Sequence, residues 1–205
     1  TRTSTDDEER RFAAFVFIPN YRRGLWAARQ GGPATELILM RHGQTAANEA
    51  HIFCGRLDPP LSLQGEEQVR RAAQVLSGPF DRVLVSPALR TRQTAQIVCP
   101  DSPLEILPEL CEVDFGEFEG LTADEIQERM PEAWKNFMNI PLHFIFPNGD
   151  DVVLYLREAE RTAELIAKGE GRVLVVSHKG FVTAALSTLL HGNASRKFNY
   201  DIAPG

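Results

Sequence analysis

Short apolar runs alternate with longer, partly polar segments along most of this chain, from Glu36 onward. The apolar runs predict strands over residues 37–40, 82–85, 104–107 and 172–176, and three of them are almost uniformly aliphatic, as strands buried on both faces are. The longer segments predict helices over 63–76, 88–98, 122–130, 151–167 and 181–190. This alternation indicates an α/β domain built around a largely parallel sheet.

The first 35 residues follow a different pattern. They hold an acidic patch over 6–9, an apolar run over 12–18, an arginine-rich stretch over 22–29 and a breaker at Gly31-Gly32-Pro33. The apolar run is too short to span a bilayer, and no small-residue cleavage site follows it. We therefore predict an N-terminal extension over 1–35, packed on or flexibly tied to a domain over 36–205.

Composition narrows the class of protein. The chain has 205 residues, of which 43% are hydrophobic and 24% charged, so it has enough apolar surface for one complete core and is not of a disordered or fibrous type. The formal net charge of −6 provides no general attraction for nucleic acid or for an anionic membrane. An anionic substrate must then be held by a local cluster of cations. Three cysteines without a CxxC pair favour a reducing, cytoplasmic compartment.

Polar groups with chemical capability follow three of the predicted strands. Arg41-His42-Gly43 follows the first, Ser86-Pro87 the second and Ser177-His178 the fourth. Ligand sites of open parallel sheets lie at the carboxyl ends of the strands, so these groups are expected at one edge. A histidine at a strand end, with a glycine beside it, serves as a nucleophile or a base, and an arginine suits phosphate oxygens. On these residues alone, a charged strand-to-loop turn without chemistry remains an equal alternative.

Four separated motifs give a more specific indication. They read LILMRHGQTAANEAHIFCGRLDPPLSLQGEEQ, VLVSPALRTRQTA, ELCEVDFGEFEG and VLVVSHKG in chain order. Together they resemble the histidine phosphatase superfamily, the phosphoglycerate-mutase-like proteins with an RHG motif, over about residues 37–201. The resemblance implies a three-layer α/β/α sandwich with a mostly parallel central sheet.

The resemblance also implies roles for individual residues. His42 matches the histidine that is phosphorylated, and Arg41, Arg90 and His178 match the rest of its phosphate pocket. Two guanidinium groups and a second histidine suit a transferring phosphoryl group, whose charge is spread over its equatorial oxygens. His42 must attack as a neutral imidazole, its other ring nitrogen held by a backbone carbonyl. Asn48 matches a residue that contacts the phosphoryl group or the substrate, and Glu112 matches the acid that protonates the leaving oxygen.

Each of these assignments has a simpler alternative in the sequence. The acid-bearing stretch holds five carboxylates and by itself looks like a solvated loop, with Asp114 the next choice after Glu112 for the acid. Arg90 stands near Arg92 and by itself suits a surface charge. Arg56, in a turn, is expected to reach the mouth of the site. His51, His143 and His191 show no metal-ligand spacing, and neither a P-loop nor a GxGxxG motif is present, so no metal and no cofactor are expected.

Three departures from the family pattern bear on substrate choice. Gln44 replaces a common glutamate, which makes that wall of the pocket neutral, and Lys179 replaces a small residue and adds a cation near the substrate's distal part. The sequence ends at Gly205, where relatives continue into a final strand, so that strand is expected to be missing or disordered. Gln44, Arg56, Lys179 and Asn48 are the predicted substrate-binding residues.

The branch within the family is predicted from two local features. The mutases have a tryptophan where this chain has Ala47, and they carry longer insertions after the acid, whereas the segment 134–151 here is short. The chain therefore resembles the compact phosphatases, with some likeness to the alpha-ribazole phosphatases. The expected function is hydrolysis of a small-molecule phosphomonoester through a phosphohistidine, without nucleic acid or membrane partners. A phosphoglycerate mutase and a catalytically silent phospho-ligand-binding relative are the alternatives, and the oligomeric state, a homodimer included, stays open.

Overall fold

A computed structural model describes residues 15–21, 35–76, 78–199 and 202 of the chain. Its sheet consists of the strands β1 (Phe15–Tyr21), β2 (Thr35–Arg41), β3 (Arg82–Val85), β4 (Glu105–Ile106) and β5 (Gly171–Ser177). Their order is β1-β2-β5-β3-β4, with β1 antiparallel to β2 and the other pairs parallel. The four strands predicted from the sequence are confirmed, although the third is shortened to two residues.

The helices are α3 (Ala46–Glu49), α4 (Leu63–Val75), α5 (Leu89–Val98), α6 (Ala123–Arg129), α7 (Pro131–Asn139), α8 (Val152–Ala167) and α9 (Lys179–His191). Short 3₁₀ helices lie at Pro108–Leu110, Gly116–Phe118, Pro141–His143 and Ala194–Asn199. All five predicted helices form, within two residues of the predicted ends. Helices α3 and α7 were not predicted, although Pro131 at the first position of α7 is a standard helix-start residue.

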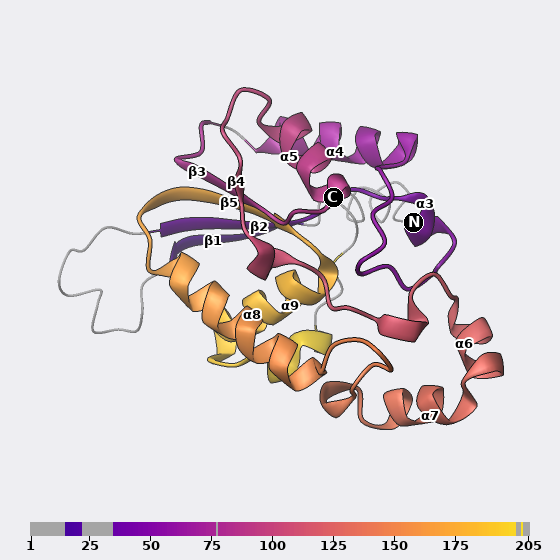
Figure 1. Ribbon diagram of the computed structural model, residues 1–205. Helices are drawn as coiled ribbons and strands as arrows, with labels where there is room; N and C mark the ends of the chain where they lie inside the picture. The colour runs from indigo at the N-terminus through magenta and orange to yellow at the C-terminus, as the bar shows by residue number, and fades with distance from the viewer. Residues whose placement is uncertain (1–14, 22–34, 77, 200–201, 203–205) are drawn as a thin grey trace, which may run out of the picture.

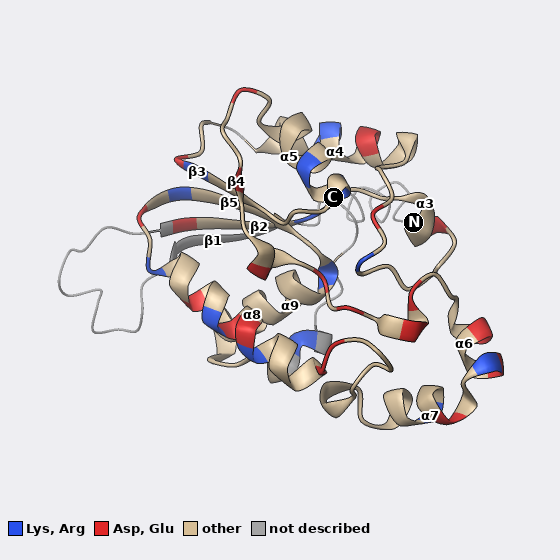
Figure 2. Ribbon diagram, viewed as in Figure 1, with Lys and Arg blue, Asp and Glu red and all other residues tan. Residues whose placement is uncertain are grey.

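The sheet separates two layers of helices, because alternate residues of each strand point to opposite faces (Figure 1). Ile38 and Met40 of β2 pack with residues of α4 and α5, whereas Leu37 and Leu39 pack with those of α8 and α9. The predicted three-layer α/β/α sandwich with a mostly parallel sheet is thereby confirmed. Helix α8 also has a buried side and an outer side: its buried residues face the sheet, and its outer side carries charges of both signs (Figure 2).

The first strand lies in a segment that the sequence pattern assigned to an extension. Backbone pairing from Phe15 with Met40 to Ile18 with Leu37 makes β1 an antiparallel edge strand. This pairing was missed because the apolar run 12–18 was weighed as a membrane or signal segment only. The acidic patch, the arginine-rich stretch and the Gly-Gly-Pro breaker lie outside the described residues, and the division at residues 35 and 36 stays a prediction.

Strand register explains where the site forms. Arg41 is the register partner of Ser177, and Val85 is the partner of Val176. His42, Ser86 and His178 therefore follow their strands at one edge of the sheet. Helices α6 and α7 lie beyond this edge (Figure 1). Helix α7 contributes Trp134 to an aromatic cluster with Phe53 and Phe118. Within the described residues, no helix is long and apolar enough to cross a membrane.

Candidate active site

His42 stands at the end of β2 with one ring nitrogen committed to the backbone. Its Nδ1 lies 2.7 Å from the carbonyl oxygen of Gly43, which can only accept, so Nδ1 carries the hydrogen and Nε2 keeps its lone pair. This is the arrangement that the sequence analysis expected for an attacking imidazole. Gly43 is required here because a Cβ would lie 2.6 Å from Val69 and 2.8 Å from the Gly65 carbonyl oxygen.

His178 lies directly beside His42. The two ring centroids are 5.2 Å apart, in an edge-on arrangement. Nδ1 of His178 is 3.2 Å from Nη2 of Arg90, a donor, so this nitrogen accepts. Nε2 of His178 then donates to Oγ of Ser86, 2.8 Å away. Ser86, in the loop after β3, and Arg90, on α5, thus fix the tautomer of the second histidine.

Arg90 is a buried charge, with a relative exposure of 1%, whereas Arg92 is exposed. Its Nη1 donates to the Leu57 carbonyl at 2.7 Å, and its Nη2 donates to the Gly55 carbonyl at 3.0 Å. Within the described part of the chain, its Nε is buried without a hydrogen-bond acceptor. A buried guanidinium with an unused donor suits an incoming phosphate oxygen. Arg90 is therefore not a surface charge, which was the alternative that the sequence left open.

Burial and positive charge act together on both histidines. Burial is the main reason that the pKa of His42 lies well below its usual value, and the charges of Arg41 and Arg90 lower it further. For His178, burial again lowers the pKa most, followed by the charges of His42, Arg90 and Arg41. Both imidazoles are therefore neutral at neutral pH. Arg41, whose charge contributes to this effect, donates from its Nη1 to the Ile202 carbonyl at 2.8 Å.

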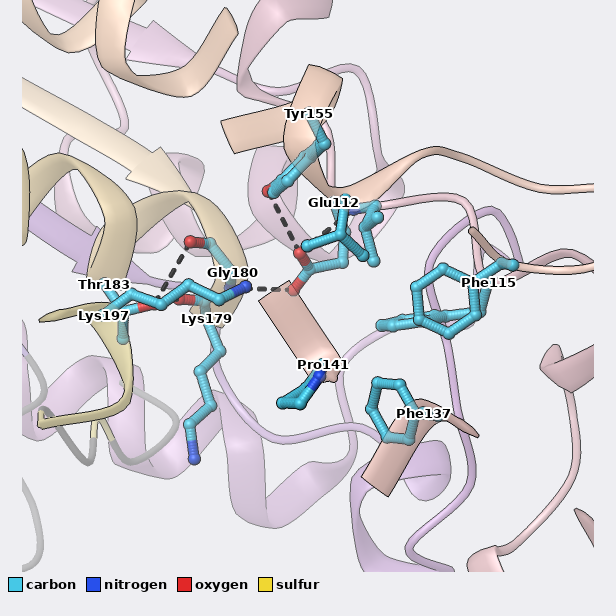
Figure 3. Close-up of a pocket in the computed structure, with 12 residues that line it drawn as sticks. Glu112, Phe115, Phe137, Pro141, Tyr155, Lys179, Gly180, Thr183 and Lys197 are labelled. Atoms are coloured by element: carbon cyan, nitrogen blue, oxygen red, sulfur yellow. Dashed lines mark hydrogen bonds between the residues drawn. The ribbon is translucent and has the colours of Figure 1, made fainter. Parts of the chain in front are cut away.

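Glu112 is the buried carboxylate of the acidic stretch; Glu109 and Glu117 are exposed, and Asp114 and Glu119 are half-buried. Its Oε1 accepts from the backbone N–H of Val113 at 3.1 Å and from the Tyr155 hydroxyl at 3.2 Å. Its Oε2 accepts from the backbone N–H of Gly180 at 3.1 Å (Figure 3). These bonds hold the carboxyl group at the start of α9, whose N-cap residue is His178. No sequence signal marked Tyr155, which stands among the apolar positions of α8.

Asp114, the alternative acid, has other partners. Its Oδ1 accepts from the backbone N–H of Gly116 at 2.9 Å, and its Oδ2 lies 3.4 Å from Nε of Arg56. Arg56 also pairs with Asp150 at 3.7 Å, so the structure places its exposed guanidinium on a carboxylate pair. Arg56 and Glu112 line the same hollow, at the margin of the site. No cluster of three or more histidine, cysteine or acidic side chains that would suit a metal occurs within the described ranges.

Asn48 and Gln44 make local hydrogen bonds. Oδ1 of Asn48 accepts from the Thr45 backbone at 3.0 Å and completes the capping box of α3. Oε1 of Gln44 accepts from Nε2 of Gln68 on α4 at 2.9 Å. The oxygen of Asn48 thus caps its own helix, and the oxygen of Gln44 is tied to α4. The predicted contacts of Asn48 and Gln44 with substrate stay predictions.

A cavity of about 420 Å³ adjoins Glu112 (Figure 3). Phe115, Phe137 and Pro141 lie on one side of it, and Lys179, Thr183 and Lys197 on another. Lys179 therefore lines a space beside the acid, and its predicted contact with substrate stays a prediction. Lys197 was missed, because it stands in the short helix after α9 and belongs to none of the recognised motifs.

Comparisons with known proteins agree with this geometry. Residues 37–205 match the histidine phosphatase superfamily (branch 1). The chain is 30% identical over 174 residues to an adenosylcobalamin/alpha-ribazole phosphatase of Escherichia coli K12, covering 82% of this chain and 86% of the relative. It is 29% identical over 170 residues to phosphoserine phosphatase 1 of Hydrogenobacter thermophilus, covering 80% and 81%.

A solved structure is similar as well. The alpha-ribazole phosphatase of Shigella flexneri superimposes with a TM-score of 0.77 at 29% identity, over 82% of this chain and 86% of that one. The family match covers the strands β2 to β5 and the residues gathered around His42. The chain belongs to the histidine phosphatase superfamily, branch 1.

Proposed function

We propose that this chain hydrolyses a small phosphorylated metabolite through a phosphohistidine formed on His42. The observation that supports this most is the pairing of a neutral His42, whose Nε2 keeps its lone pair, with His178 and the buried guanidinium of Arg90. An imidazole lone pair beside a buried guanidinium whose Nε donor is unused is what an attack on a phosphoryl group requires. The names of the E. coli and H. thermophilus relatives, both phosphatases, support the same reaction class.

In the first step, Nε2 of His42 attacks the phosphorus atom, and the bond from phosphorus to the alcohol oxygen breaks. The charge of the phosphoryl group is spread over its equatorial oxygens, and we assign its stabilisation to Arg41, Arg90 and His178. Glu112, protonated before the step, gives its proton to the leaving oxygen. The products are the free alcohol, a phosphohistidine and the Glu112 carboxylate.

In the second step, water attacks the phosphohistidine. The Glu112 carboxylate takes a proton from this water, inorganic phosphate leaves, and Nε2 of His42 regains its lone pair. The position of the carboxyl group is fixed for both steps, because the Tyr155 hydroxyl and two backbone N–H groups bind its two oxygens. Hydrolysis rather than transfer follows if water reaches the phosphoenzyme.

Rapid quench with a phosphate-labelled substrate tests the proposal. We expect label on the protein that is lost in acid and kept in base, and we expect free inorganic phosphate as the product. His42→Ala should remove both label and turnover, whereas His51→Asn, at an exposed histidine, should change neither. Turnover should need no bisphosphoglycerate primer and should persist with a chelator. A primer-dependent interconversion of phosphoglycerates, with little phosphate released, would instead support the mutase alternative.

A further inference from the structure

The cavity beside Glu112 has a preformed aromatic wall. Phe115 and Phe137 line it together with Phe146, and the centroid of Phe146 lies 5.2 Å from that of Phe115 and 5.6 Å from that of Phe137. Phe118, buried behind this wall, contacts Phe137 and Phe146 in turn, at 6.1 and 5.5 Å. Because these rings support one another, the wall needs little rearrangement to receive a flat apolar group.

The opposite side of the same cavity is cationic. Lys179 and Lys197 line it, and Glu112 is the acidic residue of the lining. The lining therefore holds two basic side chains against one acidic side chain. Lys197 is half-buried, and this burial lowers its pKa, while the charge of Glu112 acts in the opposite direction. An anionic group entering the cavity would be attracted to this side.

A second hollow, of about 500 Å³, meets the first at Glu112 and Tyr155 but has the opposite character. Its lining includes four further carboxylates, those of Glu109, Asp150, Asp151 and Glu158. Arg56 is its basic residue, and it is already paired with Asp150. A negatively charged substrate group would be repelled there. Of the two hollows next to the acid, the first therefore suits the alcohol part of an anionic substrate.

We infer that the cavity lined by Phe115, Phe137, Lys179 and Lys197 binds the alcohol part of the substrate, and that this part combines an aromatic ring with a carboxylate. The inference rests on the proposed function, because it names the leaving group of that reaction. The ring lies against the phenylalanine wall, and the carboxylate faces the two lysines. The volume of about 420 Å³ is in the range of small-molecule sites and accommodates a substituted ring.

Calorimetric binding of three phosphonates to the full chain tests this inference. Ethylphosphonate, para-methylbenzylphosphonate and para-carboxybenzylphosphonate share the anionic head, and the last two match in shape. None can be hydrolysed, so binding is measured whether or not the chain turns over. We expect the methylbenzyl compound to bind at least about tenfold more tightly than the ethyl compound. We expect the carboxybenzyl compound to bind about tenfold more tightly than the methylbenzyl compound.

Variants assign the two gains to the two walls. Phe137→Ala should reduce the advantage of methylbenzyl over ethyl to less than about threefold, and Lys197→Met should do the same to the advantage of carboxybenzyl over methylbenzyl. Each result is a ratio within one variant, so a general loss of folded protein does not imitate it. Lys135→Met removes an exposed lysine of α7 away from the cavity and should leave both ratios as in the wild type.

Equal affinity for the three phosphonates would overturn the inference, and so would a preference for methylbenzyl over carboxybenzyl. The proposed function fails separately, if no phosphohistidine forms on His42. If the affinities follow the expected order but no phosphohistidine forms, the inferred ligand class is supported and the proposed reaction is contradicted. If the chain hydrolyses para-nitrophenyl phosphate but binds the three phosphonates equally, the proposed reaction is supported and the inferred ligand class is contradicted.

Discussion

Glu119 and Arg90 hold opposite sides of the same loop. The carboxylate of Glu119 accepts from the backbone N–H groups of Gly55 and Arg56 at 2.9 and 2.8 Å. The guanidinium of Arg90 donates to the carbonyls of Gly55 and Leu57 at 3.0 and 2.7 Å. The loop whose amides bind Glu119 is therefore the same loop whose carbonyls bind Arg90, although the two side chains come from distant motifs.

Glu119→Gln should loosen this loop and with it Arg90. The amide offers one acceptor oxygen where the carboxylate offers two charged ones, and each lost charge-assisted bond is worth about 1.5–3 kcal/mol. We expect the free energy of unfolding to fall by about 1–3 kcal/mol, and KM for para-nitrophenyl phosphate to rise more than kcat falls. Glu128→Gln, the same change at an exposed position of α6, is the control. An unchanged KM would mean that Arg90 keeps its position without Glu119.

The lowered pKa values of His42 and His178 make stability depend on pH in a definite direction. Below about pH 6.5, the usual pKa of histidine, the unfolded chain binds protons that the native site does not. The free energy of unfolding should therefore fall as pH drops from about 6.5, by up to about 1.4 kcal/mol per unit from each histidine. Denaturant unfolding at several pH values measures this slope.

His42→Asn should remove one of these two contributions and make the slope shallower. His51→Asn is the matched control, because His51 is exposed and stands at a φ of 54°, a conformation that asparagine tolerates. Its slope should equal that of the wild type. If both variants show the wild-type slope, groups other than the site histidines govern stability in this range.

The sheet and the two histidines could be predicted because their signals are local. Uniform aliphatic runs identify buried parallel strands, and a polar tail after each run lies at the edge where ligands bind. The edge strand β1 could not be predicted in the same way, since an isolated apolar run does not show whether it pairs with a sheet. For Phe15–Tyr21, pairing with β2 decides the structure, and that contact is not local.

The supporting residues of the site illustrate the same difference. Glu119 and Tyr155 bind loop amides and the acid, respectively, from elements far away in the sequence. One stands in a run of carboxylates that resembles a solvated loop, and the other among the apolar positions of a helix. Their roles depend on which backbone groups the fold leaves in need of a partner, and residue type alone does not show this.

Glu112→Gln should affect substrates unequally. A general acid accelerates departure of a poor, alkyl-type leaving group by about a hundred- to ten-thousand-fold, whereas para-nitrophenolate needs little protonation to leave. We expect kcat for an alkyl phosphomonoester to fall by at least about a hundredfold, and kcat for para-nitrophenyl phosphate to fall much less. Asp114→Asn, which removes a carboxylate bound to Arg56 and Gly116, is the comparison. Equal losses on both substrates would move the acid role away from Glu112.

Gly180→Ala tests whether the acid must lie where the structure places it. A Cβ on residue 180 would stand 2.1 Å from Oε1 of Glu112, with the Tyr155 hydroxyl 3.0 Å away, so the carboxyl group has to shift. Alanine is otherwise a better helix residue than glycine at the start of α9, and stability should change by less than the activity does. We therefore expect a protein that folds and that hydrolyses alkyl phosphomonoesters at least about tenfold more slowly.

The double variant Glu112→Gln/Gly180→Ala shows whether Gly180→Ala lowers the rate by displacing Glu112. Where Glu112→Gln has already removed the proton donor, a second change that acts by displacing the donor has little left to remove, so Gly180→Ala should cost less than about threefold there. Steady-state kcat on one alkyl phosphomonoester, measured for the wild type, both single variants and the double variant, closes the cycle. Full additivity of the two losses would instead mean that Gly180→Ala disturbs His178, two residues before it, and leaves the placement of Glu112 without effect on the rate.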